Sequence, residues 1–204
     1  MKWITEFTQH KEYIKNNVEF TANGELLDFE GKPVMMKWED PIMKDAAKLI
    51  CRNGGRVLNV GFGLGLIDTY IQSHNIDEHW IIEAHPGVIS KMKEDGWDKK
   101  PNVVCKFDMW QNIYKDLPKF DGIYFDTWME STEDFHSIIH ELLNPNGVYT
   151  YFHTSNEYAG NFTQKGYKVE EHWTELNNIS ENQGYFDKTK TKHKHNLIIN
   201  NKQK

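Results

Sequence analysis

The sequence predicts an α/β fold, a mostly parallel sheet with helices on both faces. Short apolar runs alternate with amphipathic segments through the middle of the chain, and this alternation is typical of strand–helix–strand units. The runs are continuously apolar, as expected of parallel strands that are buried on both sides. The chain has 204 residues, which suits a single domain of roughly 100–200 residues.

The first part of the chain is predicted to hold two helices with a turn between them. Thr5–Lys15 favours a loose helix, and Asn23-Gly24 favours a tight turn within a hairpin or loop. The second helix is expected to start at Asp40-Pro41, with the aspartate as N-cap and the proline at the first helical position. Its apolar residues recur every three to four positions as far as Ile50, and Gly54-Gly55 lies beyond its end.

Strands and helices then alternate to the end of the chain. The expected strands are Arg56–Val60, His79–Glu83, Asn102–Lys106, Gly122–Phe125 and Gly147–Phe152. The helices expected between them are Leu64–Ser73, Pro86–Asp95, Asp108–Asp116 and Thr132–Leu143. Tyr167–Glu175 and Asn196–Asn200 are two further candidate strands, which complete a sheet of seven, the last running antiparallel.

The composition excludes several classes of protein. Lys and Arg number 24 against 30 Asp and Glu, a net charge of -6, whereas nucleic-acid binding depends on clustered basic residues. Cys51 and Cys105 are too few for a disulfide framework, which indicates a reducing, cytoplasmic setting. No apolar run is long enough to span a membrane, and the polar start is unlike a signal peptide. We therefore expect neither a nucleic-acid nor a membrane partner.

A glycine-rich turn, Gly61–Gly65, joins the first of the alternating strands to the next helix. Glycines let the backbone turn tightly and approach a ligand closely. Glu83 ends the following strand 22 residues after Gly61, a position from which a carboxylate accepts the ribose hydroxyls of an adenosine. The pattern G-x-G-x-G lacks the later glycine of G-x-G-x-x-G, which favours S-adenosylmethionine over a dinucleotide. The alternative is a plain strand–helix turn with Glu83 as a solvated strand end.

Two carboxylates are candidates for the reacting site. Asp126 ends the fourth strand, at the edge where open parallel sheets bind ligands. Glu39 stands beside large apolar residues, directly before the helix that starts at Asp40. The alternatives are that Asp126 caps the helix near Ser131 and that Glu39 is an acid favoured by the helix dipole.

Five segments between Gly31 and Tyr151 carry a more specific resemblance. They are Val34–Met43 (VMMKWEDPIM), Val57–Gly63 (VLNVGFG), Asp77–Glu83 (DEHWIIE), Phe120–Thr127 (FDGIYFDT) and Leu142–Tyr151 (LLNPNGVYTY). In these segments the chain resembles the guanidino N-methyltransferases, which include guanidinoacetate N-methyltransferase and the protein arginine N5-methyltransferases. The resemblance implies a Rossmann-like class I methyltransferase sheet. We expect a methyltransferase domain over residues 41–204 and an N-terminal helical lid that gates the substrate over residues 1–40.

The resemblance also implies a role for each matching residue. S-adenosylmethionine would be bound by Met43, Gly61, Phe62, Gly63, Leu64, Gly65, Leu66, Ile67, Glu83, Ala84, His85, Met109 and Trp110. Glu39 and Asp126 would grip a guanidinium, and Met35 would line the same pocket. His153, Thr154 and Ser155 would take the far end of the substrate, which in guanidinoacetate is a carboxylate.

The chemistry of a guanidinium favours such a pair of carboxylates, independently of the resemblance. The group is planar, carries five N–H donors and stays protonated, so two carboxylates can hold it in bidentate fashion. They would fix the attacking nitrogen about 3–3.5 Å from the methyl group, and Asp126 is the better placed to accept its proton. The predicted reaction is methyl transfer from S-adenosylmethionine to guanidinoacetate or arginine, free or in a protein.

The sequence departs from the family pattern at two places, and two rival functions are kept as alternatives. Asn59 stands where the family often has an acid, and the loop at His153 is a residue shorter than in the guanidinoacetate enzymes. The chain could instead be a catalytically silent S-adenosylmethionine-binding domain that works through a protein partner, or a methyltransferase for another small amine. A catechol enzyme would need a metal, and His136 and His140 have no apparent third ligand, so no metal site is expected.

Overall fold

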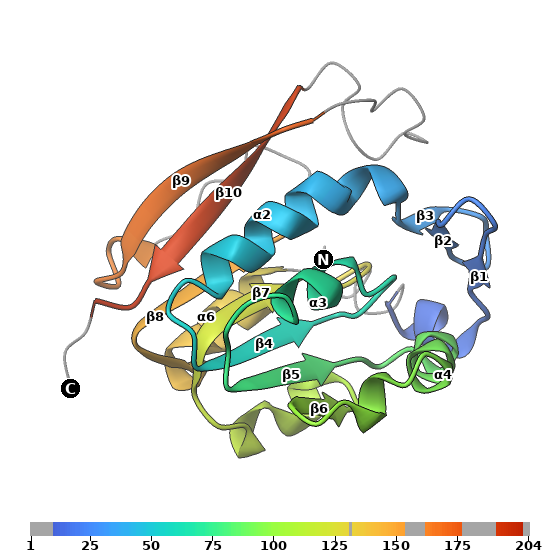
Figure 1. The fold of residues 1–204 in the computed structure, drawn as a ribbon, viewed down its shortest axis with the longest axis horizontal. Coiled ribbons are helices and arrows are strands. Elements are labelled where there is room, and N and C mark those ends of the chain that lie inside the picture. The colour runs from blue at the N-terminus through green and yellow to red at the C-terminus, as the bar shows by residue number, and fades with distance from the viewer. Residues whose placement is uncertain (1–9, 131, 154–161, 177–190, 202–204) are drawn as a thin grey trace.

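The computed structural model describes residues 10–130, 132–153, 162–176 and 191–201. A seven-stranded sheet lies at the centre of these residues (Figure 1). Its strands are β4 (Arg56–Val60), β5 (Glu78–Ile82), β6 (Val103–Lys106), β7 (Phe120–Phe125), β8 (Leu143–Tyr151), β9 (Lys168–Glu175) and β10 (Lys192–Ile199). They follow the order β6-β5-β4-β7-β8-β10-β9.

The strand directions agree with the sequence prediction. Neighbouring strands from β6 to β8 pair in parallel, whereas β10 pairs antiparallel with both β8 and β9. The last strand is therefore the antiparallel one, and it is inserted between β8 and β9 rather than added at the edge. β4 lies between β5 and β7, so the loops that follow these three strands are neighbours at one edge of the sheet.

Helices cover both faces of the sheet, which confirms the predicted α/β class. The helices are α2 (Asp40–Ile50), α3 (Leu66–Ile71), α4 (Pro86–Glu94), α5 (Trp110–Ile113) and α6 (Thr132–Leu142), with the 3-10 turns η1 (Lys37–Glu39), η2 (Trp97–Lys99) and η3 (Tyr114–Asp116). The single helix expected at Asp108–Asp116 is thus split into α5 and η3. No helix within the described ranges has both the length and the apolar character needed to cross a membrane.

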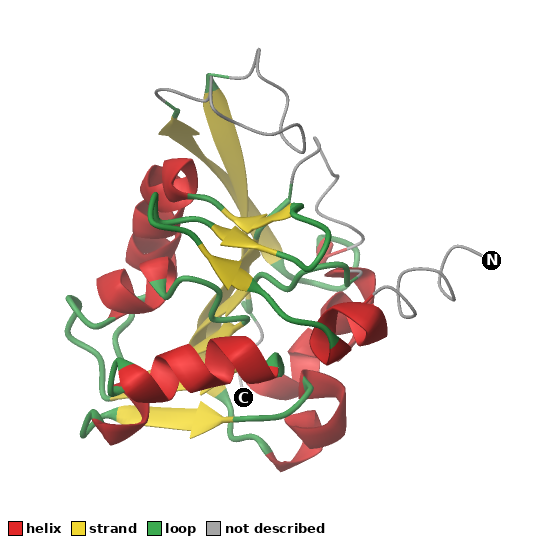
Figure 2. Ribbon diagram, turned by 90° about the vertical axis from the view of Figure 1, so that its right-hand side faces the viewer, coloured by secondary structure: helices red, strands yellow, loops and turns green. Residues whose placement is uncertain are grey.

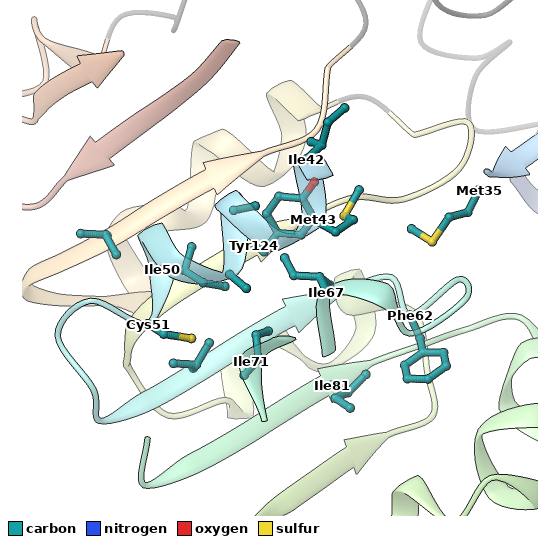
Figure 3. Packing of buried hydrophobic residues seen from close by; sticks show 14 of the residues in the cluster. Met35, Ile42, Met43, Ile50, Cys51, Phe62, Ile67, Ile71, Ile81 and Tyr124 are labelled. Atoms are coloured by element: carbon teal, nitrogen blue, oxygen red, sulfur yellow. The ribbon is translucent and has the colours of Figure 1, made fainter. Parts of the chain in front are cut away.

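The core consists of two apolar clusters, one on each face of the sheet. Side chains from α2, α3 and α4 pack with Val57 and Tyr124 in the first cluster, part of which Figure 3 shows. Side chains from α6 pack with Leu58 and Phe125 in the second cluster. Successive residues of β4 and β7 therefore enter opposite clusters, as the period of a strand requires. This double burial explains why the strands appear in the sequence as continuous apolar runs.

The N-terminal part forms a small subassembly beside the main sheet. Residues 10–15 are helical, and β1 (Glu19–Phe20), β2 (Leu26–Leu27) and β3 (Pro33–Met35) form an antiparallel sheet (Figure 2). Gly24, with a φ of +78°, confirms the predicted turn between β1 and β2. The strand β3 was not predicted from the sequence, because it is only three residues long.

The predicted cap of α2 is wrong by one residue. Glu39 occupies the N-cap position, and Asp40 is the first helical residue. The Asp40 carboxylate instead accepts a hydrogen bond of 2.9 Å from the hydroxyl of Tyr70 in α3. A tertiary contact between the two helices thus takes the side chain that local sequence rules assign to the cap.

Candidate active site

The glycine loop, Gly61–Gly65, leaves β4 at the carboxyl edge of the sheet. Gly61 has a φ of +93°, and a Cβ at this residue would lie 1.8 Å from the carbonyl oxygen of Asp126. Gly63 has a φ of +55°, and a Cβ there would lie 2.8 Å from the sulfur of Met35. Only glycine suits these conformations and these close approaches. The loop therefore contacts both the end of β7, where Asp126 lies, and the Met35 side chain. The predicted cofactor loop is thus adjacent to two of the predicted substrate residues.

Glu83 lies immediately after β5 and holds the glycine loop through a hydrogen bond to the loop backbone. Its carboxylate accepts backbone N–H bonds from Phe62 at 2.8 Å, from Ala84 at 2.8 Å and from His85 at 2.7 Å. Burial raises the pKa of Glu83, while these backbone hydrogen bonds act in the opposite direction. The acid is thus held at the strand end where the ribose is expected. Its role in ribose binding stays a prediction.

His85 joins the loop after β5 to the N-terminal helix. Its Nδ1 accepts a bond from the Gly87 N–H at 3.1 Å, so Nε2 carries the proton and donates to the carbonyls of Tyr13 and Asn16 at 3.1 and 3.0 Å. Both ring nitrogens are therefore used by the backbone of the protein itself. The expected contribution of His85 to cofactor binding stays a prediction, and its contacts show an additional structural role.

The helix of residues 10–15 is tied to the loop after β7 as well. His10 Nδ1 donates to the carbonyl of Trp128 at 2.8 Å, and its Nε2 lies 3.5 Å from Glu130. Glu130 also accepts bonds from the Trp110 indole at 3.1 Å and from the Gln111 amide. Since β5 and β7 flank β4, a helix bound to the loops after both strands passes over the loop that follows β4.

The packing of α2 on β7 brings Glu39 to the end of β7. A Cβ on Gly122 would lie 2.0 Å from the carbonyl oxygen of Ile50, so the last turn of α2 rests on that glycine. Figure 3 shows α2 running from Ile50 towards Ile42 and Met43, which lie beside Tyr124. From the contact between Ile50 and Gly122, α2 extends back to Glu39 at about 1.5 Å per residue, and β7 extends to Asp126 at about 3.3 Å per residue. The two lengths are roughly equal, so Glu39 lies near the end of β7.

Glu39 and Asp126 are consequently brought together around Tyr124. Glu39 is 1% exposed, and its carboxylate accepts the Met36 N–H at 2.7 Å. Burial raises the pKa of Asp126 to about 7. Burial also raises the pKa of Tyr124, and the charges of Asp126 and then Glu39 raise it further. No lysine, arginine or histidine in the described ranges forms an ion pair with Asp126.

The remaining predicted cofactor residues divide between the two core clusters. Met43 and Ile67 are buried in the first cluster, and Leu64 and Leu66 border it. The Leu64 N–H donates to the Met35 sulfur at 3.2 Å, which places Met35 on the glycine loop. Met109 is the N-cap residue of α5, and Trp110 packs into the second cluster. The contacts of these residues with a cofactor stay predictions.

His153, at the end of β8, begins a row of buried histidines. Its ring centroid lies 5.2 Å from that of His193, which in turn lies 4.7 Å from His195. His195 Nε2 bonds Thr174 Oγ1 at 2.8 Å, and that hydroxyl donates to Asp45 of α2 at 2.6 Å. Burial lowers the pKa of His195 to about 4, so the ring is neutral near pH 7. The other two predicted substrate residues, Thr154 and Ser155, lie outside the described residues.

A polar network that was not predicted from the sequence lies behind the glycine loop. The Asn59 amide donates to the carbonyl of Gly61 at 2.9 Å and to both carboxylate oxygens of Asp68, and His79 Nε2 lies 3.0 Å from Asp68. Asn59, Asp68 and His79 are fully buried. Asn59, where the sequence departs from the resemblance, is thus hydrogen-bonded to an acid from α3. Only the spacing of Asp68 one helix turn after Gly65 could have indicated this in the sequence.

Solved structures of low sequence identity share the fold. A spermidine synthase in complex with the transition-state analogue AdoDATO has a TM-score of 0.65 at 12% identity, over 91% of this chain and 68% of that one. A precorrin-6y C5,15-methyltransferase from Geobacter metallireducens has a TM-score of 0.59 at 14% identity, over 81% and 89% of the two chains. The fold is thus the Rossmann-like fold of class I methyltransferases.

Sequence comparison narrows this class to a family. The sequence model described as guanidinoacetate N-methyltransferase matches residues 8–200. Proteins named protein arginine N-methyltransferase 2 are 43% identical over 152 residues in Candida glabrata and 44% identical over 149 residues in Aspergillus oryzae. These matches cover 69% of this chain but only 37% and 36% of the relatives, so the chain spans little more than a third of their length. The chain belongs to the guanidinoacetate N-methyltransferase family.

Proposed function

We propose that this chain is an S-adenosylmethionine-dependent methyltransferase that acts on a guanidino nitrogen. The observation that carries the proposal is the half-buried Asp126, whose backbone contacts the glycine loop and whose carboxyl acts on Tyr124 together with the buried Glu39. A carboxylate removed from water normally needs a partner of opposite charge. A guanidinium substrate would supply that charge in a geometry suited to two carboxylates.

The residues around the glycine loop fit S-adenosylmethionine. The loop turns through glycines with positive φ at Gly61 and Gly63, which pack against the Asp126 carbonyl and the Met35 sulfur, and Glu83 is fixed at its edge. When bound, the cofactor supplies a methyl group on a positively charged sulfur and leaves as S-adenosylhomocysteine. Phe62–Ile67 would hold its methionine part and Glu83 its ribose, with Met109 and Trp110 beside the adenine.

Asp126 and Glu39 both bind the substrate, and Asp126 alone accepts a proton from it. Both carboxylates accept N–H bonds from the guanidinium and hold one nitrogen in line with the methyl group. Asp126 then accepts the proton that this nitrogen loses. Its pKa of about 7 suits a general base, because the base must be ionised at neutral pH yet bind a proton well.

The N-terminal segment, residues 1–40, is proposed to act as a lid on the domain of residues 41–204. Its helix is bound to the loops after β5 and β7 through His85 and His10. Opening this segment would uncover the carboxyl edge of the sheet, and closing it would exclude water from the transfer.

A labelled-methyl assay tests the proposed function. The substrates are guanidinoacetate, free arginine and an arginyl peptide, because the family name points to the first and the relatives' names to protein arginine. Label on one or more of them supports the proposal and identifies the substrate. Tight binding of S-adenosylmethionine with no transfer to any guanidino compound would contradict it and favour a silent binding domain or another acceptor.

A further inference from the structure

The Tyr124 side chain is buried within reach of the charges of both carboxylates. Tyr124 is 1% exposed, and its hydroxyl has no hydrogen-bond partner among the described residues. It lies two positions before Asp126 in β7, so both side chains point to the same face of the sheet. The charges of Asp126 and Glu39 both act on this hydroxyl, which raises its pKa beyond the effect of burial.

A buried hydroxyl without a partner is unfavourable for folding. Such a group costs about 1–3 kcal/mol relative to water, and unpartnered buried groups in native proteins call for an explanation. A phenylalanine would fill the same space in the first cluster without this cost. The hydroxyl therefore has no use within the described residues, and a ligand between the two carboxylates is the partner that its surroundings suggest.

We propose that the Tyr124 hydroxyl is a third binding group for the guanidinium, accepting one N–H from it. A guanidinium has five N–H donors. Two bidentate carboxylates account for four of them, and the fifth needs a neutral acceptor. A tyrosine oxygen meets this need, and a third carboxylate would add a further buried negative charge. The inference rests on the proposed function, since it concerns the same substrate site.

The test compares Tyr124→Phe with a matched control, Tyr149→Phe. Tyr149 is also fully buried with an unpartnered hydroxyl, but it packs in the second cluster on the opposite face of the sheet. Neither change removes a hydrogen bond from the described structure, so both variants should melt at the wild-type temperature or above it. Only Tyr124→Phe should raise the KM for the guanidino substrate, by about tenfold or more, with little change in kcat. Affinity for S-adenosylmethionine should stay the same in both variants.

Three results would overturn the inference. They are a wild-type KM in Tyr124→Phe, an equal loss of kcat/KM in both variants, and a lowered melting temperature in Tyr124→Phe, which would show that the hydroxyl already has a structural partner. Replacement of Tyr124 by 4-fluorophenylalanine gives a second ring without a hydroxyl and should behave in the same way.

The failure of this inference can be told apart from the failure of the proposed function. If the wild-type chain transfers no methyl group, the proposed function fails. Calorimetry then measures the affinity for arginine in the presence of S-adenosylhomocysteine, which tests the role of the hydroxyl by itself. At least tenfold weaker binding by Tyr124→Phe than by the wild type would then support the inference. Equal binding, or no binding by the wild type, would overturn it.

Discussion

Replacing Asp126 by asparagine should make the protein more stable at alkaline pH. Burial raises the pKa of this carboxyl from the ordinary 3.8 to about 7, so the folded state binds the Asp126 proton more tightly than the unfolded state does. The free energy of unfolding therefore falls as the pH rises from about 4 to about 7. Asparagine keeps the shape and cannot ionise, so it avoids this loss.

The size of the effect follows from the difference between the two pKa values. About three pH units at about 1.4 kcal/mol each set an upper limit of about 4 kcal/mol above pH 7. At pH 5 the folded carboxyl is already protonated, and the advantage of asparagine is only about 1.5 kcal/mol. The gain in stability should therefore grow by up to about 2.5 kcal/mol between pH 5 and pH 8. Asp126 is only half-buried, and its contact with water reduces this figure.

Urea unfolding of the wild type and Asp126→Asn at pH 5 and pH 8 measures this growth. The exposed Asp116 provides a control variant, Asp116→Asn, which should change stability equally at both pH values. The Asp126→Asn substitution should also lower kcat and kcat/KM together by about 10² or more, since the proton acceptor is lost. In the wild type, kcat/KM should rise with pH to a plateau above about 7. A stability difference that is the same at both pH values would refute the reasoning about burial.

Three other substitutions have distinct expected results. Glu83→Ala should weaken S-adenosylmethionine binding by about 2–4 kcal/mol in calorimetry, because charge-assisted hydrogen bonds to the ribose are lost, and an unchanged affinity would exclude the ribose assignment. Glu39→Gln should raise the KM for the guanidino substrate more than it lowers kcat, since Glu39 holds substrate and transition state alike; a pure kcat effect would show a different role. Gly61→Ala should abolish cofactor binding and lower the melting temperature, because its Cβ would meet the Asp126 carbonyl; normal binding would show that the loop can move aside.

The fold was predictable from the sequence because its elements follow local rules. The central strands β4 and β7 are buried on both sides, so their apolar runs mark them clearly. The split of α5 from η3 and the short strand β3 were missed, because segments of three or four residues carry too little periodicity to be recognised. Asp40 was misassigned because its partner, Tyr70, is distant in the sequence.

The site was predictable only in part. The glycine loop and the acid after β5 follow a spacing rule, and the segments that resemble the family contain Glu39 and Asp126. The link of Asn59 to Asp68 and His79 depends on how α3 and β5 pack, which the sequence does not show. The position of Tyr124 could have been derived from the strand period, since it precedes Asp126 by two residues on the same face.

The proposed reaction is the transfer of a methyl group to a guanidino nitrogen that is held by Glu39 and Asp126. Its most direct test is tandem mass spectrometry of the products formed with methyl-deuterated S-adenosylmethionine, by the wild type and by Asp126→Asn. We expect the wild type to place the deuterated methyl group on a guanidino nitrogen of guanidinoacetate or arginine, and the Asp126→Asn variant to give about 1% of that product or less. A label on any other group, or an equal yield from the variant, would contradict it.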